Sequence, residues 1–229
     1  MSLYFTLLLG SISVPLLLSF DKKVAFYRSW KWVLPAIILV AAEFIAWDIW
    51  LTHQGVWGFN ERYHGSWTPG GLPIEEWLFF IVVPYASLFL HYVLRAYFPN
   101  LALSDRTFKF LNYGLLALLA FLLVVFHDRT YTAYIFAHTI FALLLGLFDK
   151  RKTMQTYFLS FLLILVPFFL VNGILTGSFI EGEVVWYNDA ENMGIRIFTI
   201  PIEDSAYAFS MIYYSLFLIE WWKSKSRLT

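Results

Sequence analysis

Long apolar runs are the feature that most constrains how this chain can fold. Stretches of about 18 to 21 residues with few charges recur along it, and this is the length that an α-helix needs to cross the hydrocarbon core of a bilayer. Of its 229 residues, 60% are hydrophobic and only 14% are charged. A water-soluble fold cannot bury so many apolar runs, so the sequence predicts a polytopic membrane protein.

We expect an all-α membrane helix bundle with seven transmembrane helices, at residues 3–20, 32–51, 74–94, 107–126, 131–148, 156–176 and 202–222. Thirteen of the sixteen Lys and Arg residues fall in or beside one alternating set of connections and the C-terminal segment, and the other three are Arg62, Arg129 and Arg196. Basic residues favour the cytoplasmic side. The pattern therefore predicts a cell (inner) membrane protein whose N-terminus lies outside and whose C-terminus is cytoplasmic.

An acidic pair occurs twice, each time where an apolar run begins. Glu75 and Glu76 open the third expected span, and Glu203 and Asp204 open the seventh, 128 residues later. A shift of four spans preserves orientation, so the pattern indicates parallel three-helix repeats at residues 1–98 and 130–229, joined by a connector helix at 99–129. Repeats of this kind place a shared site near their interface.

A second pair of polar residues follows the same repeat. Asp48, near the end of the second span, corresponds to Asn172, near the end of the sixth, at an offset of 124 residues. We expect both to lie near Glu75 and Glu203. Asp48 is a candidate catalytic partner, with a structural hydrogen bond as the alternative because Asn172 cannot titrate.

The acidic pairs also have a structural explanation, because acids in the first turn of a helix offset its free N–H groups. Ionisable groups at membrane depth are nevertheless usually functional, and here the pattern is duplicated. We expect Glu75 and Glu203 to face each other across the repeat interface. Adjacent helical residues point about 100° apart, so Glu76 and Asp204 rank lower as catalytic groups.

Aromatic residues make up 21% of the chain and gather around both acidic pairs. Most are expected in the core and in the interfacial belts. Aromatic faces also stabilise cations, by about 2 kcal/mol or more once desolvated. An apolar cavity with aromatic walls and buried acids suits carbocation chemistry on a lipid-soluble substrate. The expected substrate-binding residues are Asn172, Trp50, Trp57, Phe59, Trp77, Phe79, Phe80 and Tyr207.

Several classes of chemistry lack their sequence signals. There is no Cys, no G-x-G-x-x-G fingerprint and no Walker A pattern, so we expect no flavin, nicotinamide or nucleotide cofactor. The five His residues form no closely spaced box, so no metal site is expected. The seventh span has no internal Lys for a retinal Schiff base, and paired Asp-rich motifs for a diphosphate are missing. Nothing indicates a nucleic-acid partner.

Four motifs together resemble the lycopene cyclase domain family. They are Gly55-Val-Trp-Gly-Phe-Asn60, Gly71-Leu-Pro-Ile-Glu-Glu-Trp-Leu-Phe-Phe80, Val171-Asn-Gly-Ile-Leu-Thr-Gly177 and Ile200-Pro-Ile-Glu-Asp204. The family includes heterodimers of two small membrane subunits and single chains in which the two halves are fused. This chain is similar to the fused form, because it contains both halves.

The resemblance implies an isomerase of the lycopene β-cyclase type, an intramolecular lyase that forms rings at the ends of lycopene without cofactor or redox change. A carboxyl group buried in apolar surroundings can keep its proton and act as a general acid. It would protonate the terminal double bond, the next alkene would attack the cation, and a carboxylate would remove a proton. The sequence does not determine ring type, the number of ends cyclised, the assignment of acid and base, or the oligomeric state.

Two alternatives remain at this stage. A related membrane enzyme could cyclise a longer carotenoid or hydrate the cation. A proton-coupled transporter would also use buried acids at a repeat interface, but it would normally show interrupted helices and a polar cavity.

Overall fold

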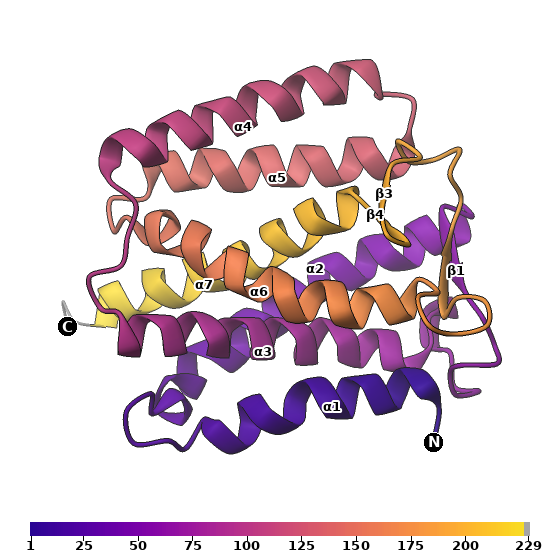
Figure 1. The fold of residues 1–229 in the computed structure, drawn as a ribbon, viewed down its shortest axis with the longest axis horizontal. Helices are drawn as coiled ribbons and strands as arrows, with labels where there is room; N and C mark the ends of the chain where they lie inside the picture. The colour runs from indigo at the N-terminus through magenta and orange to yellow at the C-terminus, as the bar shows by residue number, and fades with distance from the viewer. Residues whose placement is uncertain (227–229) are drawn as a thin grey trace.

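The structure is a computed structural model that describes residues 1–226, and these residues form seven α-helices (Figure 1). The helices are α1 (Leu3–Leu18), α2 (Trp30–His53), α3 (Ile74–Tyr97), α4 (Asp105–Val125), α5 (Thr130–Phe148), α6 (Thr153–Leu175) and α7 (Glu203–Ser226). The predicted all-α bundle is confirmed, and the predicted span ends differ from the helix ends by at most four residues. Arg227, which the count of basic residues included, lies outside the described residues.

Five helical segments within residues 1–226 are long and apolar enough to cross a membrane, and they contain α2 to α6. Helix α1 has 16 residues, which at about 1.5 Å per residue span about 24 Å, somewhat less than the roughly 30 Å hydrocarbon core. Helix α7 is longer, with 24 residues, but has acids in its first turn and lysines in its last. Length and hydropathy make the chain an integral membrane protein.

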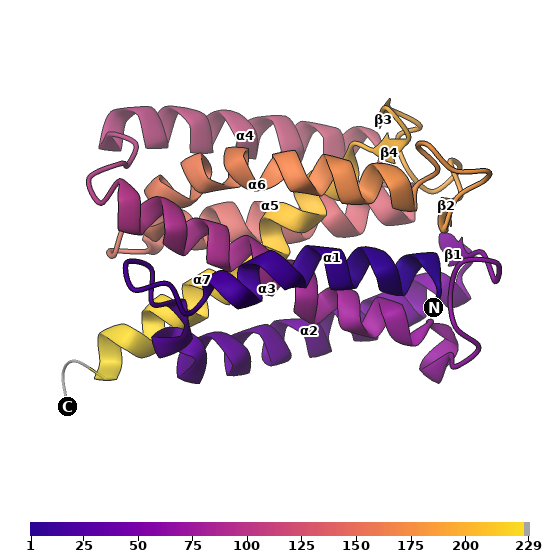
Figure 2. The same cartoon turned by 60° about the horizontal axis from the view of Figure 1, so that its bottom comes forward.

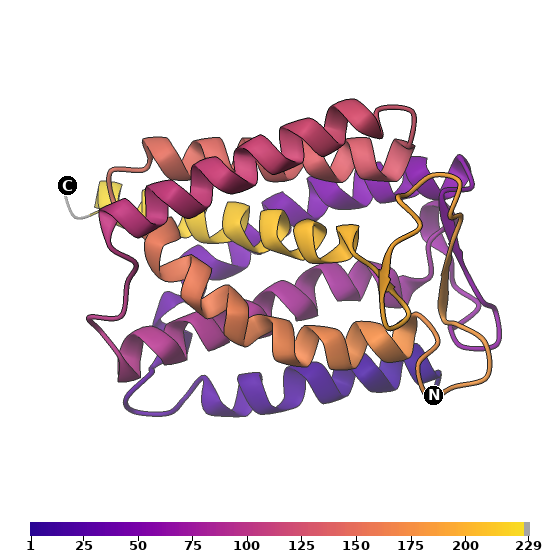
Figure 3. The same ribbon diagram turned by 45° about the horizontal axis from the view of Figure 1, so that its top comes forward.

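Four helices form the centre of the bundle. Helices α2, α3, α6 and α7 pack against one another, while α1 packs on α3 and α5 packs on α7. Helix α4 lies outermost, against α5 (Figures 1 and 3). The N-terminus and the two long connections lie at one end of the bundle, and the C-terminus lies at the other (Figure 1).

The two long connections meet in a small sheet at the N-terminal end of the bundle (Figure 2). Strand β1 (Trp57–Phe59) pairs antiparallel with β2 (Val185–Tyr187), and β3 (Arg196–Ile197) pairs with β4 (Ile200–Pro201). The sequence does not predict these strands, because segments of two or three residues are too short for a period-two pattern. Gly58 lies opposite Trp186, and a Cβ at Gly58 would overlap the Trp186 indole ring. The absence of a side chain at this position therefore permits the close approach of the two strands.

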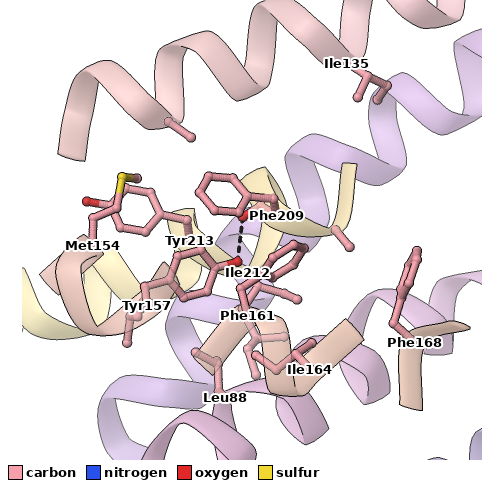
Figure 4. Packing of buried hydrophobic residues seen from close by; sticks show 14 of the residues in the cluster. Leu88, Ile135, Met154, Tyr157, Phe161, Ile164, Phe168, Phe209, Ile212 and Tyr213 are labelled. Carbon is pink, nitrogen blue, oxygen red and sulfur yellow. Dashed lines mark hydrogen bonds between the residues drawn. The ribbon is translucent and has the colours of Figure 1, made fainter. Parts of the chain in front are cut away.

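Aromatic packing joins α6 to α7 in the core. The Tyr157 hydroxyl donates to the backbone carbonyl of Phe209 at 2.8 Å, and both rings pack against Phe161 (Figure 4). Phe168 stands apart from this cluster, further along α6 (Figure 4). Because buried aromatic rings cannot shift without opening voids, these contacts hold α6 and α7 in one register.

Candidate active site

A small cavity lies where the four central helices meet the β1–β2 sheet. Its volume is about 60 Å³, and each central helix contributes one carboxyl or amide side chain: Asp48 from α2, Glu76 from α3, Asn172 from α6 and Asp204 from α7. All three carboxylic residues are nearly or fully buried. Alternate residues of the sheet form one wall, together with aromatic residues from the helices: Trp57, Phe59, Val185, Tyr187, Phe79, Phe168 and Tyr207.

Asp204 accepts hydrogen bonds from three side chains. The Tyr131 hydroxyl donates to Oδ1 at 2.5 Å, the Tyr187 hydroxyl donates to Oδ2 at 3.0 Å, and the Asn172 amide donates to Oδ2 at 3.4 Å. Burial raises the pKa of Tyr187, which lies in the sheet, and neighbouring Asp204 raises that pKa further. The Tyr187 hydroxyl therefore keeps its proton and remains a donor. Burial of Asp204 favours the neutral carboxyl group, and the three donors oppose this by stabilising the ionised form.

Glu76 has a simpler environment. Its Oε2 accepts one hydrogen bond, from the Tyr4 hydroxyl at 2.5 Å, which matches the bond from Tyr131 to Asp204. Asp48 lines the same cavity, and its Oδ2 accepts no hydrogen bond from residues 1–226. The first half thus has two carboxyl groups and one tyrosine donor, where the second half has one carboxyl group with three donors.

The structure places the first acid of each pair outside the cavity lining. Glu75 Oε1 accepts from the Ser2 hydroxyl at 2.6 Å and from the backbone N–H of Gly65 at 2.8 Å. In the second half, Glu203 Oε1 accepts from the Thr132 hydroxyl at 2.6 Å. Each glutamate thus joins the start of its own helix to the start of α1 or α5.

The backbone bond is repeated as well, because Glu203 Oε1 accepts from the N–H of Met193 at 2.8 Å. The expected ranking put Glu75 and Glu203 at the centre, but the second acid of each pair is the one that lines the cavity. The physical reason is the turn of about 100° between adjacent helical residues. Free backbone N–H groups in the preceding connection bind the first acid, which turns the second acid toward the interior.

The expected substrate-binding residues divide into two groups. Asn172, Trp57, Phe59, Phe79 and Tyr207 line the cavity. Phe80 is buried behind the wall, against Phe79 and Tyr207.

Two tryptophans lie elsewhere. Trp77 donates its indole N–H to the Pro69 carbonyl at 3.1 Å, and Trp50 is 44% exposed on the outer surface of α2. Neither tryptophan lines the cavity.

Sequence reasoning missed the hydroxyl donors Ser2, Tyr4, Tyr131 and Thr132. One signal was available in the sequence. Tyr4 and Tyr131 are separated by nearly the same number of residues as the two acidic pairs, only one fewer. Ser2 and Thr132 occupy positions that this offset does not relate, so only their position in space reveals their common role. Among residues 1–226, no group of three or more His, Asp or Glu side chains is placed to hold a metal ion.

Fold and site together define an integral membrane protein with an acidic, aromatic-lined cavity between its two halves. The sequence profile described as lycopene cyclase matches residues 1–94 and 128–222, and these segments contain every residue that lines the cavity. The chain belongs to the lycopene cyclase family, which confirms the resemblance inferred from the four motifs. No curated protein and no solved structure matches the chain.

Proposed function

We propose that this protein converts linear lycopene to a ring-ended carotenoid, with β-carotene as the main product, by acid–base isomerisation without redox change. The observation that carries the proposal is the set of three carboxyl groups around one aromatic-lined cavity, to which both halves contribute. Membership of the lycopene cyclase family supports a carotenoid as the substrate. The reaction needs a proton donor, a proton acceptor and shelter for a cation, and the cavity residues supply each.

The proton donor in this proposal is the pair formed by Asp48 and Glu76. In the second half, the Asn172 amide donates to Asp204, and Asp48 occupies the corresponding position in the first half. A protonated Asp48 can donate to Glu76 in the same way, so the pair shares one proton. Like charges in one apolar cavity disfavour ionisation of both groups, which keeps this proton available.

The proton acceptor is Asp204. Its three donors stabilise a carboxylate before the substrate arrives, and the same donors keep it in position during the reaction. The first half has Asp48 where the second half has Asn172. Because of this difference, the first half supplies the general acid and the second half supplies the general base.

The reaction is balanced without a cofactor. The acid pair adds a proton to the terminal double bond, which leaves a tertiary cation. The neighbouring alkene attacks that cation, forming the ring carbon–carbon bond, and the ring cation loses a proton to Asp204. Substrate and product have the same elemental composition, and proton exchange with solvent resets the carboxyl groups between turnovers.

The aromatic wall protects the cation. Trp57, Tyr207 and Phe79 line the cavity, and cation–π attraction contributes about 2 kcal/mol or more where water is excluded. The β1–β2 sheet covers the cavity at the N-terminal end of the bundle, which limits access of water to the cation. A water molecule that reached the cation would convert it to an alcohol.

We also propose that the N-terminus and the sheet lie on the outer side of a cell membrane and the C-terminus lies on the cytoplasmic side. The excess of Lys and Arg at the C-terminal end of the bundle supports this orientation.

The direct test is expression in a bacterial host that accumulates lycopene, followed by chromatography of the pigments. We expect ring-ended carotenoids from the wild type, and unchanged lycopene from Glu76→Gln at equal protein level in the membrane. Unchanged lycopene in the presence of inserted wild-type protein would refute the proposal. A hydroxylated acyclic product would indicate a hydratase instead.

A further inference from the structure

A second, larger hollow lies between α1, α3 and α6 on the outer surface of the bundle. Its volume is about 540 Å³, and its lining is largely apolar, with Gly10 and Val14 from α1, Ala86 from α3, and Val166 and Pro167 from α6. We call it the α1–α3–α6 groove. As these helices belong to an integral membrane protein, the groove opens toward the acyl chains of the bilayer.

The groove adjoins the acidic cavity. Four residues line both spaces, namely Phe79, Val83, Phe168 and Asn172. The cavity itself has room for only a few water-sized molecules, whereas the groove falls within the about 300–1,000 Å³ typical of small-molecule sites. A long polyene therefore cannot be enclosed in the cavity, and the groove is the adjoining space that can hold its length.

The corresponding face of the second half, between α2, α5 and α7, is filled by large side chains. At the offset that relates Tyr4 to Tyr131, Gly10 corresponds to Ala137, the residue before His138, and Glu43 corresponds to Pro167 at the 124-residue offset. His138 Nε2 lies 3.6 Å from Glu43 Oε1, and the His138 ring packs 4.4 Å from the ring of Tyr134.

Further contacts hold this filling in place. The Tyr214 hydroxyl donates to the His138 carbonyl at 2.6 Å, and Trp47 packs 4.9 Å from Tyr134. The two halves thus differ at the bilayer: the face of the first half has an open groove, and the corresponding face of the second half is occupied by packed side chains.

We propose that the α1–α3–α6 groove is the lateral entrance for the carotenoid and holds its apolar polyene arm while one end group reaches the acids. This inference rests on the proposed function, because it takes a carotenoid as the occupant. Three observations select this occupant over a lipid: the lining residues shared with the acidic cavity, the largely apolar lining of the groove, and the packed side chains on the corresponding face. Asn172 lies at the junction of groove and cavity, where the end group would pass.

The test fills the groove from a position that has free space. Gly10 is a helical glycine, and a Cβ added to it meets no atom within 4 Å, so Gly10→Phe extends into the groove without a clash at its base. Gly114 on α4 is a matched control, because it is also an exposed helical glycine with no atom within 4 Å of an added Cβ. It lies on the outermost helix, away from the groove.

We expect Gly10→Phe to lower kcat/KM for lycopene by about tenfold or more, mainly through KM, because it displaces several apolar contacts along the polyene. Gly114→Phe should stay within about twofold of the wild type. Gly10→Ala should be nearly normal and Gly10→Leu intermediate. Equal activity of Gly10→Phe and Gly114→Phe would refute the proposal that the α1–α3–α6 groove is the entrance. If Gly10→Phe does not yield folded protein, Val166→Trp fills the groove from α6 and decides the question.

A binding measurement separates this inference from the proposed reaction. In a Glu76→Gln background, retention of lycopene through purification reports occupancy without turnover. Adding Gly10→Phe should abolish pigment retention, and adding Gly114→Phe should not. Retention that Gly10→Phe leaves unchanged would mean that lipid, rather than the carotenoid, occupies the groove. If the wild-type protein retained lycopene in the groove but did not cyclise it, the proposed reaction would be refuted. The groove would still be a carotenoid-binding site.

Discussion

Substitutions at the adjacent residues Glu75 and Glu76 are expected to affect different properties of the protein. Glu75 joins the start of α3 to Ser2 and Gly65, whereas Glu76 lines the cavity with Asp48. We therefore expect Glu75→Ala to lower stability, Glu75→Gln to restore it, and Glu76→Gln to remove turnover while leaving stability near that of the wild type.

The magnitudes follow from the bonds at each position. Glu75→Ala leaves two donors without their acceptor, and an unsatisfied donor costs about 1–3 kcal/mol. Ser2 and Gly65 are only half-buried and can turn partly to water, so we expect the lower end, about 2 kcal/mol in the free energy of unfolding. Gln at position 75 keeps an oxygen that can accept both bonds. Glu76→Gln still accepts from Tyr4 but cannot deliver a proton, which lowers turnover by about 10²–10⁴.

The assay combines unfolding of the purified variants in lipid with initial rates of lycopene cyclisation. Glu203 and Asp204 provide the matched pair in the second half, where Thr132 and Met193 take the places of Ser2 and Gly65. The reasoning would be refuted if Glu75→Gln lost turnover as deeply as Glu76→Gln at unchanged stability. That result would mean that the first acid carries the proton.

Three further predictions concern the chemistry of the cavity. Asp48→Asn should reduce cyclisation by about 10² or more while the protein remains in the membrane, because the acid pair loses its shared proton; pigment chromatography measures this, and near-normal product would remove Asp48 from the mechanism. Gly58→Val should collide with Trp186 and separate β1 from β2, so water enters and mass spectrometry should detect hydrated carotenoid; an unchanged product mixture would show that the sheet does not exclude water. In deuterated water, and without added flavin or nicotinamide, each ring formed should gain about one deuterium, and rings without solvent deuterium would rule out exchangeable carboxyl groups as the proton source.

Hydropathy alone was sufficient to predict the helices. Within a bilayer each apolar run must satisfy its backbone hydrogen bonds internally, so its length determines a helix at nearly the same residues. The duplicated acidic pairs likewise identified the ends of α3 and α7 that meet at the cavity, and Asp48 and Asn172 identified those of α2 and α6. These features depend on composition and spacing along the chain, which the sequence contains in full.

Only the tertiary structure decided which acid of each pair faces the cavity. That choice depends on the rotation of each helix about its axis, which is set by contacts with distant residues: Tyr4 meets Glu76 across 72 positions, and Tyr131 meets Asp204 across 73. The pairing of β1 with β2 and the open groove beside Gly10 also arise from segments that are far apart in the chain. Local sequence patterns do not predict such contacts, because the contacts form only when the helices pack.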